Sequence, residues 1–558
     1  MPAPDPCPRC LPARLHWASR VLPMLAWAVL AGSPALAEPL VVTPDLARLA
    51  MDVRFLSDDA LEGRAVGSPG IEVAAAYHEA AFRALGLEPW LPEGYRQRFT
   101  LRAAQPDAAG TLEIAAGDRR VALDRPRRMV VVTRDPAARE VSGDLVYAGY
   151  FIDAPEQGWD DLKGLDVRGR VLLVEAGEPD ARPGGLFDGP DLTWHGRWVH
   201  KFDRAARLGA AGILIVHDEV GAGYGWDVVK TGWSREDLFT ADDPTAHLGF
   251  MGWMTGDAAR EVLAATGHDR EALRTAAGER AFRPVALGGT ATVRQAPAFR
   301  DVQASNVVGM LRATSAEARD RTIVVSAHFD HIGALPAPSG DPGPTPTDRV
   351  FNGAVDNGSA SAALLELARV LVPLRDRLNA NVVFLAATAE EAGLLGSTWF
   401  VHHLPVPTDQ VLADVNFEMT NVWGRTKDVY AIGARHSDLE EVGRRAAASL
   451  GLTLIPERDG EKGFAFRSDQ LSFHRAGIPG AWLHEGLVPA PGNRLDVAAK
   501  RGDYEKNHYH HVTDEVRDDW DLSGTAQMVE WAAAIVDELG RRREPVRFSP
   551  ESPFVRRP

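Results

Sequence analysis

The chain of 558 residues has only two cysteines, Cys7 and Cys10. Both lie in an amino-terminal segment that we predict to be removed as a secretion leader, so the mature chain would hold no thiol. This excludes a disulfide framework, a cysteine-ligated zinc site and a cysteine nucleophile. Their spacing is that of a CxxC motif. Neither cysteine follows the apolar run of the leader, at residues 21–31, which argues against a lipid-anchored cysteine at the cleavage point.

Basic residues are outnumbered, with 61 Lys and Arg against 77 Asp and Glu and a formal net charge of -16. This balance argues against nucleic acid and against anionic membrane surfaces as partners. Beyond the leader no segment reaches about 18 consecutive apolar residues, so we expect no stable membrane insertion after leader cleavage. An HExxH helix is missing as well, because His484 and Glu485 are followed by Val488 where the second histidine would have to stand.

The amino terminus has the features of a signal peptide. Arg14 and Arg20 precede the apolar run 21–31, and residues 35–37 read ALA, a small-residue cleavage pattern. We therefore predict a leader over residues 1–37 and export to the periplasm or the extracellular space. A membrane anchor is the alternative, which the shortness of the run disfavours.

The length exceeds that of a single hydrophobic core, so two domains or one domain with a large insertion are expected. Helical spacing near the start of the mature chain gives way from about residue 110 to short β-type runs, and strands and helices alternate from residue 306 onward. The predicted organisation is a leader 1–37, an amino-terminal part of the catalytic domain 38–106, an inserted domain 107–287, the catalytic domain 288–543 and a tail 544–558.

The fold class predicted for the catalytic domain is α/β, with a mixed, mostly parallel central sheet flanked by helices, and the inserted domain is expected to be a smaller β-rich α+β unit. Strands are expected at 306–311, 322–327, 382–387, 411–417 and 429–432, and helices at 46–61, 71–85, 359–372, 394–403, 439–450 and 523–539. A segment rich in Pro, Gly and Ser at 336–347 is interpreted as a surface loop near the mouth of the site.

Tryptophans crowd into a Gly-rich part of the predicted insertion, at positions 194, 198, 226, 233 and 253. Large aromatic side chains dominate packing, so we interpret them as core. A cap that leans over the active site is the alternative interpretation.

Residues able to bind metals follow the predicted strands. His328 and Asp330 come after strand 322–327, the pair Glu390 and Glu391 after strand 382–387, and Glu418 after strand 411–417. Open α/β sheets place their ligand sites at the carboxyl ends of parallel strands, so we expect these side chains to converge. Two further clusters, one around Asp356 and one of histidines at 508, 510 and 511, complete the ligand set of a two-metal hydrolase.

Each cluster has an ordinary structural explanation when taken alone. The glutamate pair suits a helix amino terminus, and Asp356 stands in a turn-like context. As a metal site, one glutamate of the pair can ligate while the other accepts a proton from water. Asp330 can accept from the second nitrogen of the His328 imidazole and so fix its tautomer. Spacing does not decide which of the three histidines ligates.

The stretches AHFDHIG, NGAVDNGSA, ATAEEAGLLGS, NFEMT and YHHVTDE, in this order, resemble the motifs of the co-catalytic di-zinc exopeptidase family. That family includes bacterial leucyl aminopeptidases, plasma glutamate carboxypeptidase and the transferrin receptor ectodomain. ALEGRAVGSPG and RSDQLSFHRAGIPG are also similar to it. Within the insertion, VYAGYF, GWDDLKGLDVRGRVLLVEAG and ARLGAAGILIVHD resemble the protease-associated domain that many members carry.

The resemblance implies two zinc ions as cofactors and peptides as substrates. His328 and Glu418 would hold one ion, Glu391 and His510 the other, and Asp356 would bridge them, with Glu390 as general base and Tyr509 stabilising the oxyanion. A hydroxide between the ions would then attack the peptide bond. Many members have aspartate where this chain has Glu418, while others have glutamate. Among the implied ligands, Glu418 is therefore the one whose residue type departs from that of many members.

The function implied is that of an exported zinc exopeptidase, by default an aminopeptidase. A carboxypeptidase or dipeptidase specificity stays open, as does the oligomeric state. One alternative is a glutaminyl cyclase-like acyltransferase that works with one zinc. Another is a receptor-like binding protein without catalysis, which the presence of suitable residues at every ligand position disfavours.

Overall fold

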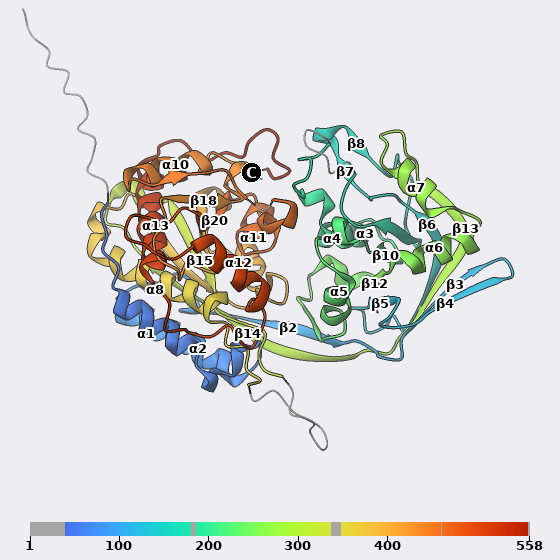
Figure 1. Cartoon of the computed structure of the whole chain (residues 1–558), viewed down its shortest axis with the longest axis horizontal. Helices are drawn as coiled ribbons and strands as arrows, with labels where there is room; N and C mark the ends of the chain where they lie inside the picture. The colour runs from blue at the N-terminus through green and yellow to red at the C-terminus, as the bar shows by residue number, and fades with distance from the viewer. Residues whose placement is uncertain (1–39, 180–185, 336–347, 459, 556–558) are drawn as a thin grey trace, which may run out of the picture. The chain divides into compact units, whose positions relative to one another are not determined.

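A computed structural model describes residues 40–179, 186–335, 348–458 and 460–555 (Figure 1). The predicted leader with both cysteines, and the predicted loop 336–347, lie outside the described residues. Among the helices in the described ranges, none combines the length and the apolar character that crossing a membrane requires.

A ten-stranded mixed sheet forms the centre of the part of the chain that carries the predicted ligands. Its strands, from one edge to the other, are β11 (Asp237–Phe239), β2 (Arg96–Gln105), β14 (Ala298–Leu311), β16 (Asn381–Ala387), β15 (Thr322–His328), β17 (Val411–Phe417), β20 (Gly480–Glu485), β18 (Asp428–Ile432) and β19 (Thr453–Leu454), with β1 (Glu88–Pro89) paired to β14.

Strand direction in this sheet changes from the centre to the edges. The neighbours β16, β15, β17 and β20 are parallel to one another. Outside them, β14 is antiparallel to β16, and β18 is antiparallel to β20. The predicted α/β class with a mixed sheet flanked by helices is confirmed, and its parallel character belongs to the central strands, whose carboxyl ends lie at one edge of the sheet.

Helices cover both faces of the sheet. They are α1 (Leu46–Leu56), α2 (Pro69–Ala84), α8 (Ala360–Leu371), α9 (Leu395–His402), α10 (Leu439–Ser449), α11 (Gln470–Arg475), α12 (Val497–Asn507) and α13 (Ser523–Arg541). The helix predicted over 46–61 is shorter than expected. It ends at Leu56, because Asp58 caps a separate 3₁₀ turn, Asp59–Arg64, by accepting from the backbone N–H of Ala60.

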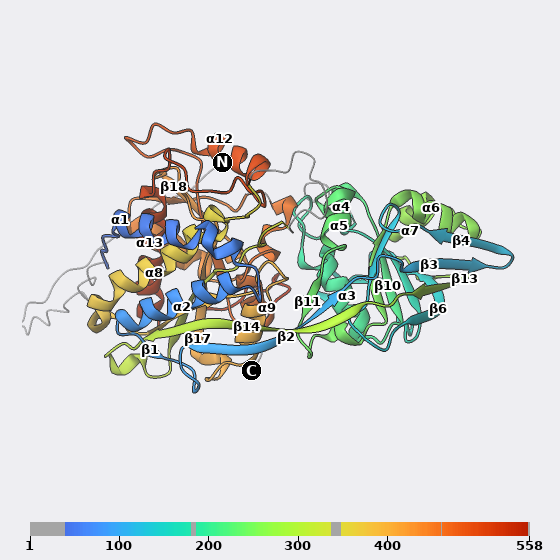
Figure 2. The ribbon, with the colours of Figure 1, turned by 90° about the horizontal axis from the view of Figure 1, so that it is seen from below.

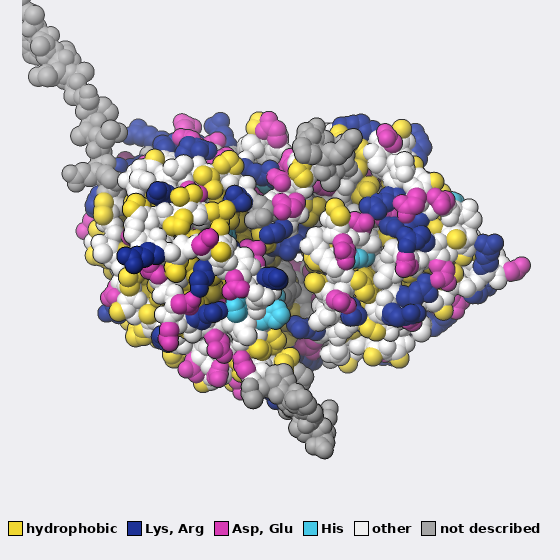
Figure 3. All heavy atoms as spheres, viewed as in Figure 1, with side chains coloured by type: hydrophobic (Ala, Val, Ile, Leu, Met, Phe, Trp, Pro, Cys, Tyr) yellow, Lys and Arg dark blue, Asp and Glu magenta, His cyan; other side chains and the backbone are white. Residues whose placement is uncertain are grey.

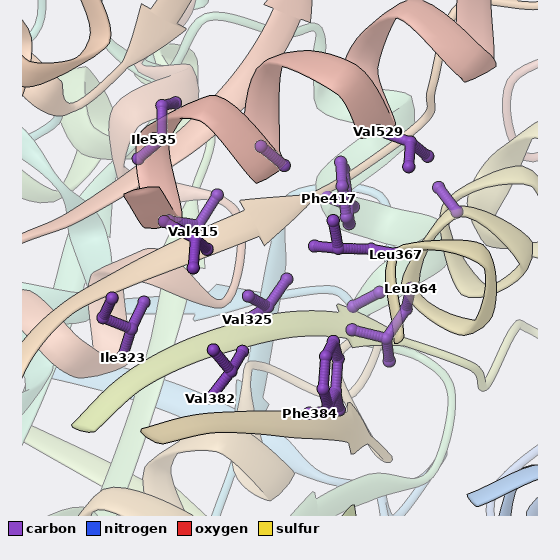
Figure 4. Close-up of a cluster of buried hydrophobic side chains, with 14 of the residues drawn as sticks. Ile323, Val325, Leu364, Leu367, Val382, Phe384, Val415, Phe417, Val529 and Ile535 are labelled. Carbon is purple, nitrogen blue, oxygen red and sulfur yellow. The ribbon is translucent and has the colours of Figure 1, made fainter. Parts of the chain in front are cut away.

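The core follows the two-residue period of the strands. Ile323 and Val325 of β15 point to the face that α8 and α13 cover, where they pack in one buried cluster with Leu364 and Val529 (Figure 4). Val324, between them, belongs to the cluster on the other face, together with residues of α9 and α11. The central strands are therefore buried on both sides, as their continuous apolar sequences predicted.

An eight-stranded sheet is built from residues 111–294. Its order is β4 (Arg119–Leu123), β3 (Thr111–Ala116), β13 (Val285–Arg294), β6 (Glu140–Tyr147), β9 (Val171–Glu175), β10 (Gly212–Val216), β12 (Phe250–Met254) and β5 (Met129–Val132). Helices α3 (Trp198–Arg207), α4 (Glu219–Ala222), α5 (Trp226–Gly232), α6 (Gly256–Ala265) and α7 (Arg270–Ala277) accompany it, and β7 (Asp153–Ala154) pairs separately with β8 (Trp159–Asp160). Strands β2 and β14 run side by side before and after this segment of the chain (Figure 2).

Four of the five tryptophans, at 198, 226, 233 and 253, belong to a core cluster of this segment, as predicted, but not all are enclosed. Trp194 instead packs in a cluster with residues of the part that carries the predicted ligands, such as Trp482. Trp253 is fully buried and packs edge-to-face against Phe202. Trp198 and Trp233 also meet edge-to-face, with ring centroids 5.8 Å apart, and are only partly buried. These two and Trp194 line a cleft that also contains the predicted ligand residues.

Candidate metal centre

Four predicted site residues lie at one edge of the sheet, at the carboxyl ends of three parallel strands or in the loops that follow them. His328 is the last residue of β15, the pair Glu390 and Glu391 stands in the turn after β16, and Glu418 follows β17 directly. Asn306 of β14 braces the turn after β16, because its Oδ1 accepts from the N–H of Thr388 at 3.0 Å. This is the edge at which sequence reasoning expected the site.

Asp356 and His510 reach the same place from other elements. Asp356 lies in the turn Ala354–Ser359 that leads into α8, and His510 lies in the loop after α12. Asp514 joins the two segments, since its carboxylate accepts from the N–H of Val355 at 2.9 Å and from that of Asp356 at 3.1 Å. The neighbouring His508 turns away to Thr513 and Arg517.

The donor atoms form two groups that share Asp356. Nε2 of His328 lies 3.2 Å from Oε1 of Glu418 and 3.4 Å from Oδ1 of Asp356. Nε2 of His510 lies 3.1 Å from Oε2 of Glu391 and 3.2 Å from Oδ2 of Asp356. Ligands at about 2.0 Å from a tetrahedral zinc ion are separated by roughly 3.3 Å. The nitrogen and oxygen donors thus have the chemistry and spacing that zinc requires, with one oxygen of Asp356 in each group.

His331 is a site residue that sequence reasoning missed. Its Nδ1 lies 2.7 Å from Oε1 of Glu391, a hydrogen-bond distance shorter than the separation of two ligands on one ion. His331, Asp356 and Glu391 could also hold a metal by their spacing. The shorter contact favours a hydrogen bond, which leaves Oε2 of Glu391 facing His510. The only sequence signal was the second histidine of AHFDHIG.

Glu390 and Tyr509, the predicted catalytic residues, line the cleft beside these donors. Oε2 of Glu390 lies 3.8 Å from Nε2 of His328, farther than the oxygens of Glu418 and Asp356. Tyr509 stacks on the ring of His510 with centroids 4.0 Å apart and is 38% exposed. Glu390 is therefore next to the donors without belonging to either group.

Asp330 supports the site in a way that differs in part from the expectation. Nδ1 of His328 lies 3.2 Å from the backbone carbonyl oxygen of Asp330 and 3.6 Å from its carboxylate. The carboxylate accepts instead from the N–H groups of Glu390 and Glu391, at 3.1 Å and 3.3 Å. Asp330 therefore orients the glutamate turn as well as the histidine.

Two more supporting residues come from stretches whose family likeness was noted but whose roles were not predicted. Ser468 donates to Oε2 of Glu418 at 2.8 Å, which leaves Oε1 for His328. Arg64 is 1% exposed and donates to the carbonyl oxygens of Leu56, Phe329 at 2.8 Å, and Gly353 at 3.0 Å. It thereby joins the loops that carry His328 and Asp356.

The protonation equilibria show how strongly negative the site is. Burial alone would lower the pKa of His328, but the carboxylates of Glu418 and Glu390 raise it well above its ordinary value. Burial, together with Glu418 and Glu391, raises the pKa of Glu390 well above that of an exposed glutamate, although His328 opposes this. So many enclosed carboxylates are costly unless cations neutralise them, which a pair of divalent ions would do.

The site opens into a cleft of about 1310 Å³. Its lining combines the donor residues with side chains of the 111–294 segment, among them Trp194, Arg197 and Trp198. In the space-filling view, histidine side chains gather beside a hollow in the surface (Figure 3). A peptide-sized ligand has room there.

Comparison with known proteins points to one family. Residues 306–536 match Peptidase family M28, and this range includes every predicted donor. Aminopeptidase YwaD of Bacillus subtilis (strain 168) is 29% identical over 189 residues, which are 33% of this chain and 36% of that protein. Leupeptin-inactivating enzyme 1 of Streptomyces exfoliatus is 32% identical over 157 residues, 27% of this chain and 34% of that protein. The chain thus matches only about a third of the length of either relative.

Among solved structures, an aminopeptidase from Aneurinibacillus sp. strain AM-1 superposes with a TM-score of 0.50 and 21% identity. The alignment covers 92% of this chain and 98% of that one. At this identity the likeness shows the fold, and it extends over most of the described residues.

Proposed function

Because residues 306–536 belong to peptidase family M28, we propose that the chain is a zinc-dependent exopeptidase, and specifically an aminopeptidase. The match to this family confirms the resemblance of the motifs within residues 306–536 to zinc exopeptidases. The observation that carries the proposal is the donor spacing of 3.1 to 3.4 Å in two groups around a shared aspartate. The Bacillus subtilis relative is named as an aminopeptidase, which supports the choice of reaction.

In the proposed site, His328 and Glu418 would hold one zinc ion, Glu391 and His510 would hold the other, and Asp356 would offer one carboxylate oxygen to each. When bound, the ions would supply Lewis acidity, which polarises a peptide carbonyl and lowers the pKa of water. His331 keeps Glu391 in its rotamer by donating to Oε1, and Ser468 does the same for Glu418.

Glu390 is proposed as the general base. Burial and neighbouring carboxylates favour its protonated form, and the cations would shift that balance towards the carboxylate, so it can both take and return a proton. It takes a proton from the attacking water and passes it to the nitrogen of the leaving amine. The backbone N–H of Glu390 is held by Asp330, which fixes the position of the carboxyl group.

Tyr509 is proposed to donate a hydrogen bond to the oxygen on which negative charge develops. Although the side chain is partly exposed in the cleft, loss of hydration around its hydroxyl, followed by the charges of Asp356 and Glu391, raises the pKa of the phenol well above the ordinary value. The hydroxyl therefore keeps its proton at neutral pH. The stacked His510 ring limits its orientations.

The proposal is tested with purified protein and leucine p-nitroanilide, in zinc-loaded and chelator-treated form. We expect hydrolysis by the zinc-loaded form, its loss on chelation, and its return when zinc is added back. Blocking the substrate's amino group should prevent cleavage. A protein that cleaves only amino-blocked substrates would contradict the aminopeptidase assignment, and pyroglutamate formation with one zinc per chain would favour the cyclase alternative.

A further inference from the structure

Two arginines in the cleft have no acidic partner among the residues that the structure describes. Arg197 precedes α3 and is 6% exposed. Arg467 precedes Ser468, the residue that donates to the proposed ligand Glu418. In the described part of the chain, Nε of Arg197 and both Nε and Nη2 of Arg467 are buried without a hydrogen-bond partner. Both residues line the same cleft as the metal donors.

Four other arginines along the cleft do have acidic partners. They are Arg134, 2.7 Å from Asp237; Arg204, 3.7 Å from Asp153; Arg207, 3.2 Å from Asp203; and Arg475, 3.5 Å from the same Asp203. Arg235 also lines the cleft without an ion pair, but it is exposed. Among the described arginines of the lining, buried N–H groups without a hydrogen-bond partner therefore distinguish Arg197 and Arg467. Buried guanidinium groups are normally paired, because removing their N–H groups from water is costly.

The two unpartnered guanidinium groups are close enough to influence each other. Burial, and then the positive charge of Arg467, lower the pKa of Arg197 to about 10. Arg467 lies over the rings of Phe464 and Tyr224, 5.5 Å and 6.0 Å from their centroids. Its charge also acts on Tyr509, beside the proposed ligand His510. An anion between the arginines would relieve their repulsion and satisfy the free N–H groups.

We propose that Arg197 and Arg467 form a subsite for a carboxylate of the substrate. This inference rests on the exopeptidase function proposed above and narrows its substrates to peptides with a carboxylate near the cleaved bond. The planar, forked guanidinium group suits bidentate binding of a carboxylate. That carboxylate is either the terminal one of a very short peptide or the side chain of Asp or Glu.

Matched neutral and anionic substrates test the subsite. Leu-Gly is compared with Leu-Gly amide for the terminal carboxylate, and Leu-Glu amide with Leu-Gln amide for the side chain. We expect wild-type protein to favour the anionic member of at least one pair by roughly ten- to a hundredfold in kcat/KM, the range that charge-assisted hydrogen bonds supply. The pair that shows the preference identifies the source of the carboxylate.

The variants Arg197→Gln and Arg467→Gln should remove most of this preference by raising KM for the anionic substrate, while kcat/KM for the neutral amide stays close to wild type. Turnover of the neutral amide also reports that each variant folds. Arg467→Lys, which keeps the charge and loses the fork, should retain part of the preference. Arg207→Gln is the matched control, because Arg207 lines the same cleft but is paired with Asp203. This variant should prefer the anionic substrate as strongly as the wild type does.

Equal cleavage of acid and amide in both pairs by the wild type would overturn the subsite whatever the variants do, and would leave the exopeptidase proposal intact. Variants that keep the full preference would overturn it as well. Failure of the zinc-loaded wild type to cleave any of the substrates would overturn both proposals.

Discussion

At the residue scale, the proposed catalysis depends on two adjacent glutamates whose surroundings differ. Oε1 of Glu391 accepts from His331 and Oε2 faces His510, so both of its oxygens are engaged. Burial alone would raise the pKa of Glu391, but His510 lowers it to about 2. Glu390 has no such imidazole at hydrogen-bond distance, and its pKa is raised. The surroundings of Glu391 thus favour the charged carboxylate that a cation needs, whereas those of Glu390 favour proton exchange.

Replacing each glutamate by glutamine should separate these roles. In Glu390→Gln we expect kcat to fall by about 10²–10⁴-fold with zinc content unchanged, because only the proton acceptor is lost. In Glu391→Gln, activity and zinc content should fall together. Steady-state kinetics and elemental analysis of the same samples measure both effects. Full activity in Glu390→Gln would rule out its role as base.

At the scale of elements, the strands and the residues that follow them were the most predictable. The expected strand 411–417 coincides with β17, and 322–327 is β15 without its last residue, His328. Continuous apolar runs mark buried parallel strands, and a polar residue directly after such a run is placed at the sheet edge by topology alone. The choice of His510 among the clustered histidines needed the family motif, since spacing left it open.

Supporting contacts between distant loops could not be predicted from the sequence. His331 lies in the same motif as His328, yet nothing in its spacing separates a ligand from a hydrogen-bond donor to Glu391. Arg64 stands in a Gly-rich connection and reaches Phe329, which is 265 residues away. Such contacts depend on how loops from separate elements meet. Hydrophobic periodicity predicts each helix or strand separately and does not predict contacts between loops.

Arg64 also yields a prediction about how the loops are held. Arg64→Met would leave the carbonyl oxygens of Leu56, Phe329 and Gly353 without their buried donor. Each unsatisfied group costs about 1–3 kcal/mol, so we expect the thermal midpoint to fall by roughly 5 °C or more. Circular dichroism during heating measures this. Arg98→Met is the control, since Arg98 is exposed on β2 and its loss should change the midpoint little.

At the scale of the whole molecule, the proposed metal centre joins segments that are far apart in the chain. Its donors come from the ends of β15 and β17, the turn after β16, the turn before α8 and the loop after α12. The chain has a formal net charge of -16, and the centre concentrates buried carboxylates at one edge of the sheet. Cations bound there would both connect these segments and remove part of their mutual repulsion.

Metal binding should therefore stabilise the fold as well as support catalysis. A ligand present at about 100 times its dissociation constant stabilises the native state by about 2.7 kcal/mol, which corresponds to several degrees in the thermal midpoint of a protein of this size. We expect chelator-treated protein to melt at a lower temperature than zinc-loaded protein, with the difference growing as free zinc is raised. Asp356→Ala removes the residue shared by both donor groups, so zinc should raise its melting temperature much less than that of the wild type. Identical melting curves for wild-type protein with and without zinc would show that these donors do not bind the metal, because binding to the native state alone must shift the unfolding equilibrium.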